Sequence, residues 1–60
     1  MWEISYMIFN SHTGKEQEER TVCNAFRISD GVIMAFEDAE ESQLYMVLPL
    51  HRLIVVVRKY

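Results

Sequence analysis

This 60-residue chain has a single cysteine, Cys23, so it cannot form an internal disulfide. It also lacks the ligands of a structural zinc site, because its two histidines and one cysteine are scattered without the usual spacing. A domain of this size buries only about 60% of its unfolded surface and usually needs a disulfide, a metal or a partner. We therefore expect a partner, and the commonest partner is another copy of the same chain.

Long apolar runs are also missing. The longest, Met46–Leu50 and Leu53–Val57, are far shorter than the roughly 20 residues of a spanning helix. The first residues carry an early acid and no basic run, so no signal peptide is expected. Half of the residues are hydrophobic and the net charge is only −3, which excludes a disordered chain. Together with the unpaired thiol, these features predict one cytoplasmic domain over residues 1–60, without membrane contact.

The N-terminal half of the sequence predicts two strands. Apolar and polar residues alternate over residues 2–9, which is typical of a half-buried strand. Residues 10–15 are turn-forming, and Gly14 can supply a positive φ. A second strand is predicted over residues 20–29. The charged residues 16–20 before it are expected to be a solvated strand end or part of a hairpin tip.

Asp30-Gly31 is the strongest turn signal, because both central residues of a type I′ hairpin turn need a positive φ. It leads into a third predicted strand, residues 32–37. Residues 38–42 are too few for a stable helix and predict a loop. A fourth strand is predicted over residues 43–48, ended by Pro49, which cannot donate to the ladder.

Residues 50–52 predict a 3₁₀-like turn that feeds a fifth strand, residues 53–59. In small five-stranded barrels such a turn often brings the last strand back beside the first. The sequence therefore predicts an all-β fold: a five-stranded antiparallel, strongly bent sheet or an SH3-like small barrel. The alternative is an open β-meander completed by a subunit interface.

The third and fifth predicted strands are apolar on both faces. A central strand buried on both faces has this pattern, and a barrel corner or the opposite sheet could hide the second face. A 60-residue barrel has only one interior, however, so we favour a subunit interface that covers an otherwise exposed apolar patch. The predicted interface residues are Ile33, Ile54 and Val56.

No arrangement of residues indicates catalysis. Cys23 lies among apolar neighbours in a predicted strand, where a buried and inert thiol is the expected state. The carboxylates form two groups, within residues 16–19 and 37–41, and neither has the alternating ligands of a calcium loop. The two glycines, Gly14 and Gly31, are far apart and form no phosphate-binding loop. The prediction is a protein without enzymatic activity, cofactor or metal.

A small anionic ligand would need cationic or aromatic side chains. The guanidinium group of Arg52 can bind phosphate or carboxylate through two hydrogen bonds. The neighbouring His51 could join it, or could instead bond to the backbone carbonyls that Pro49 leaves without a partner. The candidate ligand-binding residues are His51, Arg52, Arg58, Tyr45 and Tyr60.

The leading hypothesis is a small non-enzymatic interaction module that self-associates and binds a host protein or a small anionic ligand. An inhibitor carried by a phage or mobile element is one version of it. The alternative is a nucleic-acid-binding small barrel with a C-terminal patch of Arg52, Arg58, Lys59 and Tyr60. Nine acidic residues against six basic ones disfavour that alternative.

Overall fold

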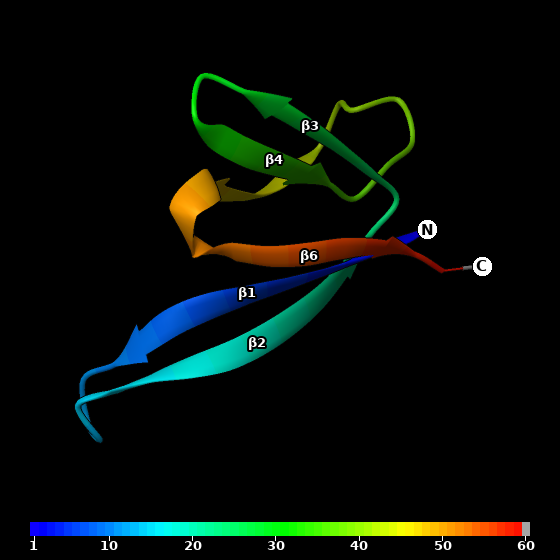
Figure 1. Ribbon diagram of the computed structural model, residues 1–60. Helices are drawn as coiled ribbons and strands as arrows, with labels where there is room; N and C mark the ends of the chain where they lie inside the picture. Colours follow the sequence, from blue (N-terminus) through cyan, green and yellow to red (C-terminus); the bar gives the residue numbers. More distant parts are fainter. Residues whose placement is uncertain (60) are drawn as a thin grey trace.

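The protein is described by a computed structural model that covers residues 1–59 (Figure 1). Its elements are β1 (Trp2–Asn10), β2 (Lys15–Cys23), β3 (Ala25–Ser29), β4 (Val32–Phe36), β5 (Leu44–Pro49), the 3₁₀ turn η1 (Leu50–Arg52) and β6 (Leu53–Arg58). The strands form two antiparallel three-stranded sheets, the first in the order β2-β1-β6 and the second in the order β3-β4-β5. The all-β prediction is confirmed.

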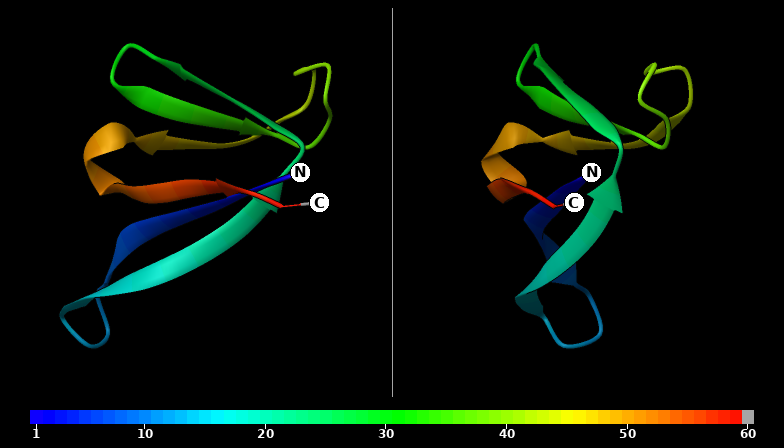
Figure 2. Two further views of the ribbon diagram at one scale, coloured as in Figure 1. Left: turned by 45° about the vertical axis from the view of Figure 1, so that its right-hand side comes forward. Right: turned by 90° about the vertical axis from the view of Figure 1, so that its right-hand side faces the viewer.

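The prediction of five strands is wrong, because the expected strand over residues 20–29 is two strands that belong to different sheets. They meet at Asn24, where the chain turns from one sheet into the other (Figure 2). Asparagine is unfavourable within strands. Here its backbone N–H donates to the carbonyl of Phe36 at 3.1 Å, and its side-chain amide donates to the carbonyl of Glu37.

The charged segment before that bend is also regular strand. β2 begins at Lys15 and pairs with β1 along its whole length, from Asn10↔Lys15 to Trp2↔Cys23. β6 pairs with only the first part of β1, between Trp2 and Tyr6. The far end of the β1–β2 hairpin therefore projects beyond the rest of the first sheet, at the lower left of Figure 1.

Within residues 1–59 the two sheets do not close into a barrel. Strand pairing does not join β5 to β6, and η1 links these two strands instead. The predicted barrel is thus not confirmed. The predicted 3₁₀ turn over residues 50–52 is confirmed, and so is Pro49 as the end of the preceding strand.

Both predicted turns are confirmed by their backbone geometry. Asp30 and Gly31 have φ values of 51° and 77°, as a type I′ turn requires, and they place Ser29 opposite Val32. At the other hairpin, the side-chain oxygen of Asn10 accepts a hydrogen bond of 2.9 Å from the N–H of His12, and Gly14 has a φ of 69°. The predicted loop over residues 38–42 also contains no helix.

The core lies between the two sheets. Its buried members are Ile4 and Cys23 from the first sheet and Ile33, Ala35 and Leu48 from the second. Ile4 and Ile33 are the largest fully buried side chains. Trp2 packs beside this core, and its ring is nearly perpendicular to that of Phe26, at 5.0 Å between ring centroids. Trp2, Ile4 and Tyr6 of β1 all face this core, so the alternation predicted for this strand is confirmed.

Candidate functional site

The structure does not bring the candidate ligand-binding residues together. Arg52 ends η1 and Arg58 ends β6, so the strand separates them. At about 3.3 Å per residue, six residues of strand span roughly 20 Å. A small anion cannot contact both guanidinium groups, and Tyr60 lies outside the described residues.

Arg52 is already engaged within the chain. Its Nη1 donates to both carboxylate oxygens of Glu16, at 2.8 and 2.7 Å. This ion pair links η1 to the projecting end of the β1–β2 hairpin and offsets the charge of Arg52. His51, the neighbouring candidate, is exposed on η1.

The basic residues at the end of β6 also have partners. Arg58 lies over the ring of Trp2, with its guanidinium carbon 5.9 Å from the ring centroid. The Nζ of Lys59 is 3.8 Å from a carboxylate oxygen of Glu3. The carboxylate of Glu3 offsets the charge of Lys59, which reduces the positive field that a nucleic-acid patch would need.

Tyr45, the remaining ligand candidate, belongs to a cluster of hydroxyl groups. Its hydroxyl shares a hydrogen bond with that of Thr21 on β2, which links the two sheets. Tyr6 is nearby, and burial raises its pKa, with further contributions from the charge of Glu19 and from Tyr45. Tyr6 therefore remains protonated at neutral pH, and this cluster has the features of a structural link.

Cys23 and the possible metal ligands are the other residues with reactive or coordinating side chains. Cys23 is buried, and burial raises the pKa of its thiol, so little reactive thiolate is present at neutral pH. Among residues 1–59, no three His, Cys, Asp or Glu side chains gather where they could hold a metal ion.

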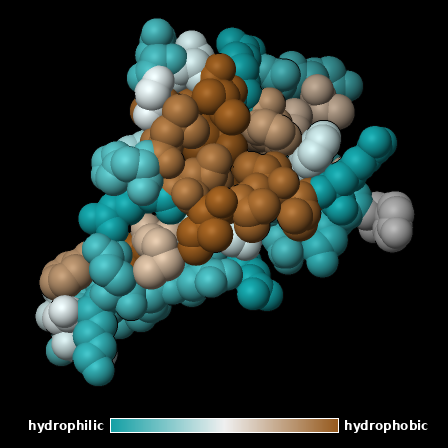
Figure 3. All heavy atoms as spheres, viewed as in Figure 1, coloured by the Kyte–Doolittle hydropathy of each residue, from teal (hydrophilic) through white to brown (hydrophobic). Residues whose placement is uncertain are grey.

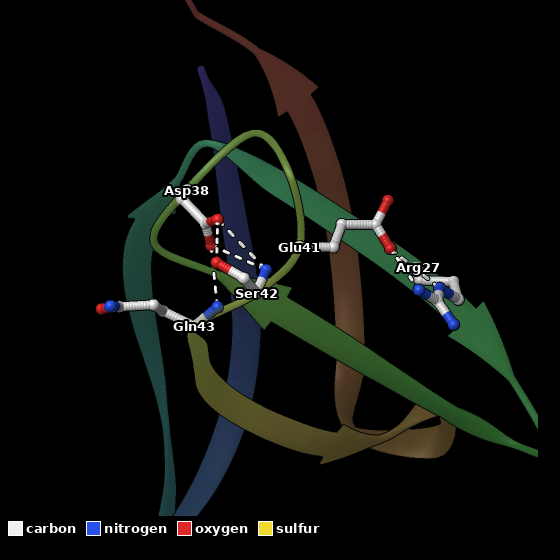
Figure 4. Close-up of polar contacts among 5 residues, drawn as sticks. All are labelled: Arg27, Asp38, Glu41, Ser42 and Gln43. Carbon is white, nitrogen blue, oxygen red and sulfur yellow. Dashed lines mark hydrogen bonds and ion pairs between the residues drawn. The ribbon is translucent and has the colours of Figure 1, made fainter.

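The loop over residues 37–43 is held by Asp38 (Figure 4). Its carboxylate accepts hydrogen bonds from the backbone N–H of Ser42 at 3.0 Å and of Gln43 at 2.8 Å, and from the Ser42 hydroxyl. In the same loop, Glu41 binds Arg27 of β3 at 2.6 Å. The guanidinium group of Arg27 lies over the ring of Phe36, so this pair covers one end of the second sheet.

We expect the Asp38 carboxyl to titrate below the ordinary aspartate range. The Ser42 hydroxyl, followed by the Gln43 N–H, lowers its pKa. Because folding lowers this pKa, the contribution of Asp38 to stability is complete above the unfolded pKa of about 3.9 and is lost as pH falls through the lowered value. A carbon-detected NMR titration measures it. Ser42→Ala is expected to bring the pKa closer to the ordinary value, and an unchanged pKa in that variant would contradict the assignment.

The most distinctive surface features are apolar. On β4, Ile33 and Ala35 point into the core, so Val32 and Met34 point outward, whereas Phe36 is buried with the guanidinium group of Arg27 over its ring. On β5, Val47 lies opposite Met34 and Leu44 lies opposite Phe36, and they are 51% and 56% exposed. The outer face of the second sheet is therefore apolar along both β4 and β5.

The outer face of the first sheet is apolar around β6. Val55 pairs with Ser5, and Val57 pairs with Glu3, whose other neighbour is Val22 on β2. Val55 and Val57 are 45% and 39% exposed. Ile54 is also exposed, at the point where an irregularity interrupts the pairing of β6 with β1.

The exposed apolar residues on the outer faces of the two sheets differ in part from the predicted interface residues. Ile33 is fully buried inside the chain, so its side chain offers no surface to a second subunit. Val56 packs against the core, whereas Ile54 is exposed. Val47, Val55 and Val57 were not predicted as interface residues. Alternation along a strand shows that it has two faces, but it does not show which face points inward.

Figure 3 shows apolar side chains gathered in the middle of one face, over β4 and β6, with polar residues along the projecting hairpin. No family model, curated protein or solved structure matches the chain. None of the residues 1–59 belongs to a helix with the length and hydrophobicity to span a membrane.

Proposed function

We propose that this protein is a non-enzymatic interaction module that assembles with itself and, through that assembly, presents a surface to a target protein. The observation that carries the proposal is the balance of apolar side chains. Among residues 1–59, ten large hydrophobic side chains are exposed, against six buried hydrophobic residues. Apolar surface on that scale, in a chain this small, is typical of proteins that complete their burial in an interface.

The shape that presents these faces is, in this proposal, a partly open SH3-like barrel. β2 and β3 continue from one sheet into the other, and η1 returns β6 to the side of β1. A cytoplasmic setting belongs to the same proposal, since the lone Cys23 has no partner for a disulfide within the chain. An inhibitor encoded by a phage or mobile element is one role open to a module of this kind.

A protein target is favoured over a small anion, because Arg52 and Arg58 are far apart and the first is paired with Glu16. Nucleic acid is the less favoured partner for a similar reason. Arg20, Arg27, Arg52 and Lys59 each lie within 4 Å of a carboxylate. We expect the protein to pass through a heparin column at low salt, whereas salt-dependent retention would favour nucleic acid.

Native mass spectrometry of the protein isolated from its own cells tests this function. One spectrum gives the number of subunits and the mass of anything bound. We expect a defined oligomer, alone or with a protein partner. A bare monomer at every concentration would contradict self-association, and bound oligonucleotide would replace the protein target with nucleic acid.

A further inference from the structure

The outer edge of β6 has free backbone groups. The N–H of Lys59 donates to the carbonyl of Met1 at 2.8 Å, and Arg58 and Val56 lie opposite Trp2 and Ile4. Hydrogen-bonded and non-hydrogen-bonded pairs alternate along an antiparallel ladder. Because Lys59 bonds toward β1, Arg58 and Val56 turn their N–H and C=O groups to the opposite side. β6 ends its sheet, so these groups face an open edge.

The other sheet edges carry features that oppose pairing. β2 has a charged run from Lys15 to Arg20. On β5 the N–H of Leu50 bonds to the carbonyl of Gly31, so the preceding Pro49 faces outward, and proline has no N–H to donate. β3 is five residues long and carries Arg27 in the middle.

Natural sheets use charge, proline and short strands to prevent edge-to-edge pairing. β6 has none of these between Leu53 and Val57, and its only irregularity is at Ile54. Among the edges that residues 1–59 form, it is therefore the one suited to accept another strand.

We propose that β6 pairs antiparallel with β6 of a second copy of this chain, about a two-fold axis at Val56. This inference rests on the proposed self-association and specifies its interface. The β2-β1-β6 sheets of the two copies then become one continuous sheet. The free N–H and C=O groups of Val56 in one copy bond to those of Val56 in the other. A two-fold axis makes the interface self-complementary, as closed dimers require.

Charge favours this register over its two neighbours. An axis at Val55 would bring Arg58 to the level of Arg52, the last residue of η1, in the second copy. An axis at Val57 would place the two Arg58 residues only two positions apart, about 7 Å, and like charges at such short distances are destabilising. With the axis at Val56, Arg58 faces Ile54 instead. The two Arg58 residues are then four positions apart along the strand, about 14 Å, which exceeds the Debye length of about 8 Å at physiological salt.

The side chains agree with this register. Val55 and Val57 lie on the outer face of the first sheet, both partly exposed. With the axis at Val56, Val55 of one copy lies directly opposite Val57 of the other, in a non-hydrogen-bonded pair where side chains approach most closely. Four valines therefore meet at the centre of the joined sheet.

Two double variants test the proposal and its register. Val55→Lys/Val57→Lys places Lys opposite Lys in both cross-strand pairs, whereas Val55→Lys/Val57→Glu places Lys opposite Glu in both. We expect the Lys/Glu variant to dimerise at least about tenfold more tightly than the Lys/Lys variant. With an axis at Val55, by contrast, residue 55 would face itself, and both variants would lose the dimer equally. Sedimentation equilibrium measures the dissociation constants, and circular dichroism checks the fold.

Val47→Lys, on the outer face of the second sheet, is the matched control and is expected to leave the dimer intact. Hydrogen exchange tests the β6 pairing on the unmodified protein. The amide of Val56 is expected to be protected at high concentration and to lose protection on dilution.

If both double variants weaken the oligomer equally, the register with its axis at Val56 is wrong. If the unmodified chain is an oligomer whose mass neither double variant changes, the β6 pairing is wrong while self-association stands. An amide of Val56 that stays unprotected in such an oligomer would have the same meaning. A chain that is monomeric at every concentration would overturn both proposals.

Discussion

Replacing Asp30 with proline is expected to abolish the cooperative folding of this protein. Asp30 has a φ of 51°, and proline is confined to about −65°, so the type I′ turn cannot form. That turn fixes the register of β3 on β4, which places Ile33 in the core. At roughly 0.05–0.15 kcal/mol per residue, a chain of this size has about 3–9 kcal/mol of stability. We expect the free energy that is lost with the central hairpin to exceed this total stability.

Asp30→Asn is the matched control, because asparagine also accepts a positive φ. We expect its free energy of unfolding to stay within about 0.5 kcal/mol of the unmodified protein. Urea denaturation followed by circular dichroism, at one protein concentration throughout, measures both variants. A proline variant that unfolds at the same urea concentration as the unmodified chain would show that this turn is not type I′.

Truncating Ile33 to alanine is expected to cost about 2–5 kcal/mol, the range for a large side chain removed from a packed core. Ile33 is fully buried, and it lies between the two sheets with Ile4 and Leu48. So large a fraction of the total stability should leave much of the protein unfolded at 37 °C.

Ile28 provides the control for that substitution. It is the same residue type and lies directly opposite Ile33 on β3, but it is 51% exposed. We expect Ile28→Ala to cost less than about 1 kcal/mol, since much of its side chain is already in water. Ile28 and Ile33 are cross-strand partners on the same face of the second sheet, so equal losses for the two alanine variants would mean that the packed core extends to the edge strand β3.

Local signals explain why much of this fold was predictable. The alternation of β1, the Asp30-Gly31 turn, and Pro49 followed by a 3₁₀ turn each depend on a few neighbouring residues, and all are confirmed. Their stereochemistry is nearly the same in any surrounding structure. The sequence therefore predicted where most strands begin and end.

The errors arise where distant residues decide the structure. Nothing local shows that Asn24 would divide a strand, because its bend depends on hydrogen bonds to Phe36 and Glu37. The charged first half of β2 is extended because it pairs with β1. The ion pair of Arg52 with Glu16 was likewise not predicted, because Glu16 is far away in the sequence.

The apolar faces show the same division between local and distant information. Alternation correctly indicated that β4 and β6 have two apolar faces. The choice between core and surface depends on how the second sheet packs on the first. Ile33 was therefore predicted as an interface residue although it is buried, and the exposed Val47 was missed.

Sedimentation equilibrium of the unmodified protein, over a wide range of concentrations, tests the central claim most directly. That claim is that the exposed apolar surface is covered by a second copy of the chain. We predict a discrete dimer, or a small closed oligomer built from it, which dissociates to monomer on dilution. A single species with the monomer mass at every concentration would contradict the claim and leave the apolar surface around β6 without a self-association role.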